Sequence, residues 1–273
     1  MSVINTNVSA LFAQNTLAKN ARAQSTSMEQ LSTGSRINSA KDDAGGLAIG
    51  QNMTAQVRGL NQAVRNSNDA INMLQTAEGA MVEQSNMLQR MRELAVQANN
   101  GTYSDTQRGY LNTEFKALAS QINTIASQTT WNGQSLLATS GTTSFTYQTG
   151  INSGNTMIVS VAGTTTTGLK MSTTTAISTQ ALATTALTTL DSAIDSVNSA
   201  RATIGASINR LEYATDNMTN VSANVQASRS TIMDTDYATA STSLSKTQII
   251  QQAATAMLAQ ANQQPQSVLS LLK

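Results

Sequence analysis

The side chains of this sequence that could do chemistry are carboxylates and hydroxyls, because the chain contains no histidine and no cysteine. Asp42 and Asp43 are adjacent, and paired carboxylates can serve as general acid and base. Gly45 and Gly46 follow them, however, a combination typical of a turn between two helices. The missing residue types exclude nucleophilic cysteine, disulfides, and nearly all zinc or haem ligation. We therefore predict no catalytic residue, no metal and no cofactor, and expect a protein that is not an enzyme.

Charge and hydropathy exclude two classes of partner. Lysine and arginine number 16 against 15 aspartates and glutamates, and the basic residues are scattered, so no basic face for nucleic acid is expected. No run of roughly 18 apolar residues is present, which predicts no contact with a membrane through a spanning helix. The N-terminus lacks the charge pattern of a cleavable secretory signal. Aromatic residues make up only 3% of the chain, which suits packed helices better than a compact globule.

Two long stretches carry an apolar residue every seven positions. One row runs from Met53 through Met81 to Ala95, with Ser67 as its one polar member, and the other runs from Ala183 to Ile232. Sustained heptads indicate coiled-coil packing, and two such stretches in one chain can fold back on one another as a rod. The row residues that we expect to pack inside this rod are Leu60, Leu74, Leu88, Leu190, Val197, Ile204 and Leu211.

The companion rows of both repeats are less regular. The first begins with Val57, Val64 and Ile71 but continues with the polar Glu78. The second includes Ile194 and Ile208 among polar residues. We expect the apolar members of these rows to complete the two seams.

Short polar segments separate the helices. An Asn-Gly turn is predicted within residues 99–105, with Ser104 or Asp105 as the cap of the following helix. Trp131-Asn132-Gly133 ends that helix.

A small β-hairpin is predicted in the middle of the chain. Residues 145–148 and 157–161 have the pattern of two strands joined by a turn rich in glycine and asparagine. The surrounding segment, about 139–180, is dominated by serine and threonine. Because it offers little to bury, we predict an exposed linker there instead of a second core.

Both ends of the chain carry apolar stripes, although protein termini are usually polar and frayed. In the C-terminal segment the stripe follows alternating steps of four and three residues, the spacing of a seam along a helix. Such ends are expected to meet each other or other copies of the chain, and in an isolated chain their unpaired faces favour disorder. The residues that we expect to drive pairing and polymerisation are Ile4, Val8, Leu11, Ile250, Met257, Val268 and Leu271.

These patterns together predict a mainly α fold. Its parts are a long antiparallel coiled-coil helical rod, a small β-hairpin, and terminal helices that form a paired coiled coil. The predicted domains are an inner terminal-helix domain of residues 1–44 with 235–273, and a rod domain of residues 45–234 that includes the hairpin and the linker at about 139–180.

The chain resembles the bacterial flagellins over about residues 1–140 and 180–273. The resemblance is carried by long stretches that occur in the family's order. These stretches are VINTN (3–7), LSTGSRINSAKDDA (31–44), QRMRELAVQ (89–97), SQTTWNG (127–133), DYAT (236–239) and residues 248–263 and 265–272.

This resemblance implies a structural subunit that polymerises into the flagellar filament for swimming motility. It implies export of the unfolded chain through the flagellar type III channel and an extracellular location in the filament. The implied partners are other copies of the chain, the flagellar cap and hook-associated proteins, and an export chaperone at the C-terminal helix. Only the hairpin and linker separate Trp131 from Ala183, so the outer domains of larger flagellins are absent and a thin, smooth filament is expected.

The resemblance also implies a surface for an immune partner. Arg90, Leu94 and Glu114 coincide with the surface that the innate immune receptor for flagellin recognises. The position of these residues beside the heptad seam predicts that they are exposed or contact other subunits. We therefore expect the monomer to be recognised and assembly to cover the same surface.

Other functions fit parts of the pattern. A hook–filament junction protein shares the terminal helices, but the matches at 90–97 and 248–272 favour flagellin. An extracellular coiled-coil adhesin has no need of apolar seams at both ends. A flagellin bearing a metallopeptidase insert needs two histidines on one helix, which this chain does not contain.

Overall fold

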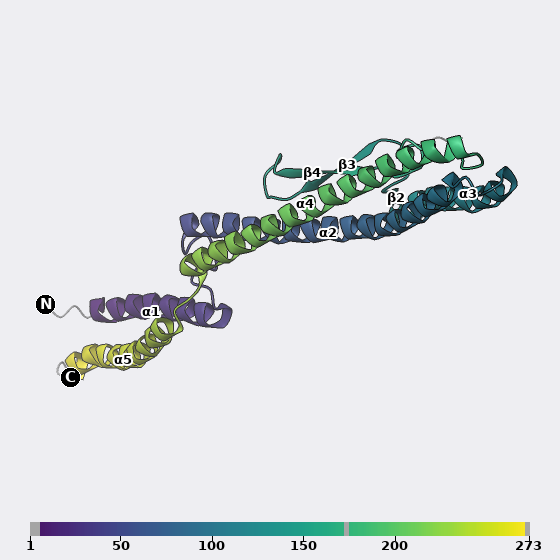
Figure 1. Cartoon of the computed structure of the whole chain (residues 1–273). Helices are drawn as coiled ribbons and strands as arrows, with labels where there is room; N and C mark the ends of the chain where they lie inside the picture. The colour runs from purple at the N-terminus through teal and green to yellow at the C-terminus, as the bar shows by residue number, and fades with distance from the viewer. Residues whose placement is uncertain (1–5, 172–174, 271–273) are drawn as a thin grey trace. The chain divides into compact units, whose positions relative to one another are not determined.

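The computed structural model describes residues 6–171 and 175–270, with side chains up to residue 263. Helices dominate this part of the chain (Figure 1), as the heptads predict. In chain order the elements are α1 Val8–Thr33, α2 Ala44–Asn99, α3 Asp105–Gln128, β1 Thr130–Trp131, β2 Gln134–Ser135, β3 Thr142–Gln148, β4 Thr156–Ala162, α4 Gln180–Met233 and α5 Tyr237–Ser270.

The chain forms two compact units. Unit 1 comprises the chain up to Val57 and from Ala223 onward, and unit 2 comprises Arg58–Ser222. Both divisions therefore fall inside the long helices α2 and α4, whereas the sequence patterns place them near the loops at 44 and 235. A heptad helix continues without a break where its packing partners change, which explains why no loop marks the boundary.

Within unit 2, α2 and α4 are antiparallel. The Thr184 hydroxyl donates to the Asn99 side-chain oxygen at 3.0 Å, near the end of α2 and the start of α4. Further along, Arg92 pairs with Asp191 at 2.6 Å. Arg201 of α4 lies 3.5 Å from Glu78 of α2. Residue numbers thus fall along one helix as they rise along the other, and the predicted antiparallel arrangement is present.

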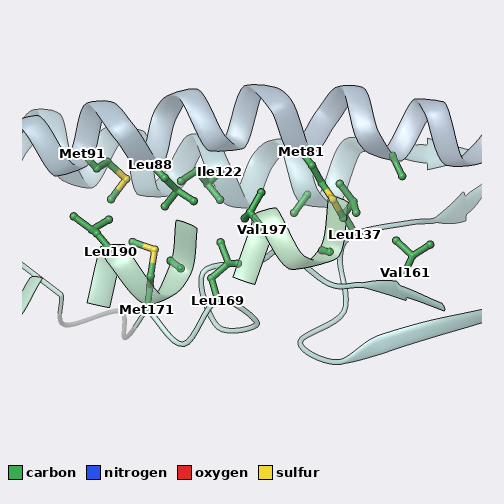
Figure 2. Close-up of a cluster of buried hydrophobic side chains, with 14 of the residues drawn as sticks. Met81, Leu88, Met91, Ile122, Leu137, Val161, Leu169, Met171, Leu190 and Val197 are labelled. Carbon is green, nitrogen blue, oxygen red and sulfur yellow. The ribbon is translucent and has the colours of Figure 1, made fainter. Parts of the chain in front are cut away.

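The core of unit 2 contains the large heptad residues of both helices (Figure 2). Leu60 is 4% exposed and the other six residues predicted to pack are 1% exposed or less. These six are Leu74, Leu88, Leu190, Val197, Ile204 and Leu211.

The second buried row of each helix consists mainly of small residues. On α2 it lies one position before the predicted companion row, so Val64 and Ile71 are only half-buried beside it, whereas Val57, the first residue of the predicted row, is buried. On α4 it also lies one position earlier, and Ile194 and Ile208 are half-buried. Small side chains let two helices approach closely along one side of the seam. The buried rows are Ala63, Ala70, Ala77, Gln84, Met91 and Ala98 on α2, and Ala186, Ala193, Ala200 and Ser207 on α4.

Helix α3 begins with a capping box and covers the same core. The Ser104 hydroxyl accepts the Gln107 amide, and the Gln107 side chain accepts the Ser104 amide, so two free amides of the first turn are paired. Arg108 is buried and donates to the carbonyls of Ala98 and Asn100 at 2.7 and 3.1 Å. A cation among the last carbonyls of a helix is stabilising, so Arg108 fixes the end of α2 to the start of α3.

Two hairpins follow α3. The turn of the β1–β2 hairpin has positive φ angles at Asn132 (48°) and Gly133 (78°), the backbone of a type I′ turn. The longer pair, β3 and β4, is antiparallel with Phe145 opposite Val159. Tyr147 of β3 donates to the Met73 sulfur at 2.7 Å, and burial raises the pKa of Tyr147 to about 12.

The prediction of an exposed linker at residues 139–180 is wrong. Val161, Leu169, Met171 and Ile177 are all 3% exposed or less and belong to the core cluster, and Figure 2 shows the first three of them beside the helix residues. Hydrogen bonds hold this segment to α3. Asn123 pairs with both the amide and the hydroxyl of Thr166, at 2.9–3.1 Å, and Asn112 accepts the Ile177 amide at 3.0 Å. A few well-spaced apolar residues therefore bury a segment whose average composition is polar.

Candidate assembly interface

The terminal helices α1 and α5 pair with each other inside unit 1. The Asn7 side-chain amide donates to the Ala261 carbonyl at 2.8 Å. Asn20 donates in the same way to Thr247 at 2.7 Å, and Ser27 bonds Ser243 at 3.3 Å. The helices are therefore antiparallel. Each helix therefore covers part of the other along the described residues, whereas the disorder expected for the ends of an isolated chain stays a prediction.

The seam between α1 and α5 is made mainly of small and polar residues at three- and four-residue steps. Its members are buried or half-buried, and only four of them, Leu17, Leu244, Ile250 and Leu258, are large apolar residues. Buried amides that are hydrogen-bonded fix the register of a helix pair. The seam residues are Ala10, Ala13, Leu17, Asn20, Gln24 and Ser27 on α1, and Ala240, Leu244, Thr247, Ile250, Ala254, Leu258 and Ala261 on α5.

Large apolar side chains remain exposed on both helices. On α1, Val8 is 63%, Leu11 51% and Phe12 75% exposed. On α5, Ile249 is 67% and Met257 66% exposed. Exposed apolar residues that are concentrated on one helix pair mark an interaction surface. We call these five residues the apolar surface of unit 1.

The predicted polymerisation residues divide between the two faces. Val8, Leu11 and Met257 lie on the apolar surface, and Ile250 lies half-buried in the seam. Placing Met257 in one seam with Ile250 is wrong, because the seam advances from Ala254 by four residues to Leu258. Three predicted residues cannot be placed in this way. Ile4 and Leu271 lie outside the described residues, as does the side chain of Val268.

The segments that carry the apolar surface have no charged residues. None occurs among positions 1–18 or 247–272. Two copies of such a surface meet without charge repulsion and without desolvating an ion. Phe12 and Ile249 lie off the apolar stripes predicted from the sequence, and the uncharged runs are the sequence signal that marks the segments containing them.

The connections to α1 and α5 are joined by a short backbone bridge. The Arg36 amide donates to the Met233 carbonyl at 2.6 Å, and the Thr235 amide donates to the Gly34 carbonyl at 2.9 Å. Gly34 has a φ of 70°, and a Cβ there would lie 2.9 Å from the Tyr237 hydroxyl. Glycine is thus required both by the backbone conformation and by the limited space. The hydrogen bonds connect the segment that follows α1 to the segment that precedes α5.

The acidic pair found in the sequence has a structural role. Asp42 accepts the hydroxyl and amide of Ser39 at 2.8 and 2.9 Å, and these hydrogen bonds lower the pKa of Asp42. Asp43 accepts the Gly46 amide at 2.9 Å in the first turn of α2. Both carboxylates are occupied by local backbone groups, in keeping with a turn between helices. Among residues 6–171 and 175–270, no cluster of acidic side chains could hold a metal ion.

Acid should loosen the start of α5. Asp236 accepts the Thr239 hydroxyl at 2.8 Å and the Ala238 amide at 2.9 Å, and the hydrogen bonds from Thr239 and Ala238 lower its pKa. A lowered carboxylate pKa stabilises the fold above the unfolded value near 4 and stops doing so as the pH falls through the folded pKa. We expect amide exchange at Ala238 and Thr239 to show lower protection factors at pH 3 than at pH 6.

Two variants test this dependence on pH. In Asp236→Asn the cap is kept without a titrating group, so the pH effect on protection should disappear. Asp216→Asn, an exposed carboxylate within α4, is the control and should leave the pH effect unchanged. Equal protection of the wild-type amides at both pH values would contradict the prediction.

The predicted immune surface is only partly exposed. Arg90 bridges Glu114 of α3 at 3.0 Å and Glu93 at 2.9 Å, and the side chains of Arg90 and Glu114 are about half exposed, 51% and 47%. Leu94 is 1% exposed and belongs to the core of unit 2. Its assignment to a contact surface is therefore wrong, because it points to the side of α2 that packs inside the unit.

A membrane-spanning helix is not found among the described residues, because no helix there combines the necessary length and hydropathy.

Comparison with protein families matches the N-terminal and C-terminal parts of the chain separately. A family model for the bacterial flagellin N-terminal helical region matches residues 4–142, and one for the bacterial flagellin C-terminal helical region matches residues 187–272. Together they include all of α1, α2, α3 and α5 and most of α4.

Whole-chain relatives point the same way. A flagellin of Halalkalibacterium halodurans is 42% identical over 276 aligned positions, which cover 99% of this chain and all of the relative. The flagellar filament 33 kDa core protein of Treponema phagedenis is 40% identical, with 99% of this chain and all of the relative covered. Flagellin A of Vibrio cholerae is 35% identical over 377 positions, covering 99% of both chains.

Solved structures are similar as well. The crystal structure of Bacillus cereus flagellin superposes with a TM-score of 0.51 at 37% identity and covers 59% of this chain and 94% of that one. A flagellar hook-associated protein from Vibrio parahaemolyticus has a TM-score of 0.58 at 17% identity, covering 70% of this chain and 99% of that one. The second likeness concerns the fold alone.

Proposed function

The chain belongs to the bacterial flagellin family and is a structural subunit of the flagellar filament, not an enzyme, and on this premise we propose how its terminal helices build the polymer. The polymer is the extracellular filament of a bacterial flagellum. The seam between α1 and α5 holds the two ends of one chain together. The apolar surface of unit 1 then contacts other copies. Contacts between different patches of identical subunits that do not close into a ring give an open helical polymer.

The observation that supports this proposal is the exposure of five large apolar side chains in the segments 1–18 and 247–272, which contain no charged residue. These side chains are Val8, Leu11, Phe12, Ile249 and Met257. Burying one such side chain contributes roughly 1.5–3 kcal/mol. Several per subunit, repeated at every contact, are enough to offset the loss of motional freedom on assembly. Salts that strengthen apolar burial should therefore promote polymerisation.

Seeded assembly tests the proposal directly. Purified chain that has been dissociated by heat is returned to a precipitating salt with short filament seeds, and electron microscopy follows the product. We expect long, uniform filaments. A chain that ends at residue 243 loses most of α5, leaves α1 without its partner, and should remain a soluble protein with a helical unit 2. Filaments from the shortened chain would contradict the proposal.

We also infer a thin filament. The alignment with flagellin A of Vibrio cholerae is 377 positions long, whereas this chain has 273 residues, so more than a hundred positions of the alignment have no counterpart in this chain. Between α3 and α4 this chain has only the two hairpins and the buried segment that follows them.

We further propose that the chain is exported unfolded through the flagellar type III channel. Its proposed partners are the flagellar cap, the hook-associated proteins and an export chaperone that binds α5.

A second proposed partner is the innate immune receptor for flagellin. The observation in its favour is the half-exposed ion pair of Arg90 and Glu114, which joins α2 to α3 on the surface of unit 2. Leu94 is buried and takes no part in the proposed contact. The contact is proposed for the monomer, because packing against other copies would cover it.

The double variant Arg90→Ala, Glu114→Ala should weaken receptor signalling by the monomer at least about tenfold, the equivalent of about 1.4 kcal/mol of binding free energy. The loss is expected because both charged contacts disappear while the buried core is untouched. Signalling in a receptor-expressing reporter cell measures it.

A matched pair of residues provides the control. Arg92 and Asp191 form an ion pair of similar exposure, 48% and 53%, between α2 and α4. Arg92→Ala, Asp191→Ala should signal like the wild type. If the two double variants behave alike, the assignment of Arg90 and Glu114 fails.

A further inference from the structure

The methionines of this chain fall into distinct classes of exposure. Those in the core of unit 2, such as Met81 and Met91, are inaccessible at 0% exposure. Met53, Met87 and Met233 are half-buried. Within the described residues, only Met28 at 55% and Met257 at 66% are more than half exposed. Both lie on the paired terminal helices.

Met257 belongs to the apolar surface of unit 1. The hydrogen bond from Asn7 to Ala261 sets the register of the pair, so Met257, four residues before Ala261, lies level with Leu11 on the antiparallel partner. Leu11 and its neighbour Phe12 are both more than half exposed. No charged residue lies within ten positions of Met257 in the sequence. The thioether therefore stands in an uncharged, apolar environment that the proposed contact with another copy would bury.

We propose that Met257 is an oxidation site through which peroxide blocks assembly of the free subunit. The sulfur takes one oxygen atom from hydrogen peroxide, the O–O bond breaks, and water leaves. The thioether is oxidised by two electrons to the sulfoxide, and the peroxide is reduced. The reaction replaces a flexible apolar side chain with a polar one. An assembled subunit is protected because the same surface is covered.

This inference rests on the proposed polymer, since oxidation is expected to act through the surface that assembly uses. Loss of one apolar contact of this size should raise the critical concentration for assembly about tenfold or more. The effect should be reversible, because reduction by thiols in the presence of a methionine sulfoxide reductase returns the thioether and water.

The test compares treated and untreated full-length chain. Monomer is exposed to dilute hydrogen peroxide, the excess is removed with catalase, and sulfoxides are located by mass spectrometry of peptides. Met28 and Met257 should be oxidised before Met81 and Met91. The critical concentration is then measured in seeded assembly with a precipitating salt. We expect it to rise at least about tenfold and to return after reductase treatment.

The double variant Met28→Leu, Met257→Leu provides the control, because leucine keeps the apolar volume and is not oxidised. It should assemble like the untreated wild type, before and after peroxide. If oxidised wild type assembles at an unchanged concentration, or if the leucine variant is inhibited just as strongly, the inference is overturned while the polymer stands. If untreated wild type forms no filaments, the proposed contact fails and the inference fails with it.

Discussion

Replacing Leu11 and Phe12 together by aspartate should abolish filament assembly at concentrations where the wild type polymerises fully. The two side chains are 51% and 75% exposed on α1, and each contributes roughly 1.5–3 kcal/mol if another copy buries it. Their combined loss corresponds to an increase of about a hundredfold or more in critical concentration. Burying the new carboxylates would add a further cost.

The fold of the chain should survive this change. Neither side chain lies in the seam with α5. Acidic residues are favourable toward the N-terminal end of a helix, and α1 begins at Val8. Circular dichroism should therefore report the same helix content and the same unfolding transition as in the wild type.

A conservative double variant separates the loss of apolar contact from any effect of position. Leu11→Met, Phe12→Leu keeps the surface apolar and uncharged, so it should assemble with a critical concentration within a few-fold of the wild type. Filaments from the double aspartate variant at the wild-type concentration would mean that this part of α1 faces solvent in the polymer.

Periodicity predicted the helices and one row of the core but not the second row. Leu74, Leu88 and Leu190 stand out because large apolar residues every seven positions are rare by chance. Ala70 and Ala193 do not stand out, because alanine is abundant in this chain and is favoured on every face of a helix. The row that lets the helices approach closely is therefore the row that pattern alone cannot identify.

The same limit explains the errors at the candidate sites. Arg90 and Leu94 are one helical turn apart, yet one is exposed and the other is in the core. The side chains of adjacent residues such as Met257 and Leu258 likewise point in directions that differ by about a quarter of a turn around the helix axis. The position of an apolar stripe predicted from sequence is uncertain by one residue. An error of one residue is enough to assign a residue that contacts another chain to a contact within its own chain, or the reverse.

The segment at 139–180 fails for a different reason. Its average composition is polar, but the residues that decide its burial are few and widely spaced, as Val161, Leu169 and Ile177 illustrate. Their partners lie on α2, α3 and α4, far away in the sequence. Composition averages over a window, whereas packing depends on individual side chains.

Leu137 lies just before this segment and belongs to the same core cluster, so Leu137→Ala should destabilise unit 2 as a core substitution does. Leu137 is completely buried, and Figure 2 shows it beside Met81 of α2. Removing a buried leucine side chain to alanine costs about 2–5 kcal/mol, depending on how far the cavity collapses. Urea unfolding followed by the fluorescence of Trp131, the single tryptophan of the chain and a residue of the adjoining hairpin, should show a lower midpoint with an unchanged m value.

Leu182→Ala makes the same chemical change where the side chain is 41% exposed. It leaves no enclosed cavity, and alanine is a good residue for the first turns of α4, so its cost should be below about 1 kcal/mol. The difference between the two variants measures burial at position 137, because the atoms removed are the same. If both cost equally little, Leu137 contributes no more than a surface residue, and the prediction of a core position there is wrong.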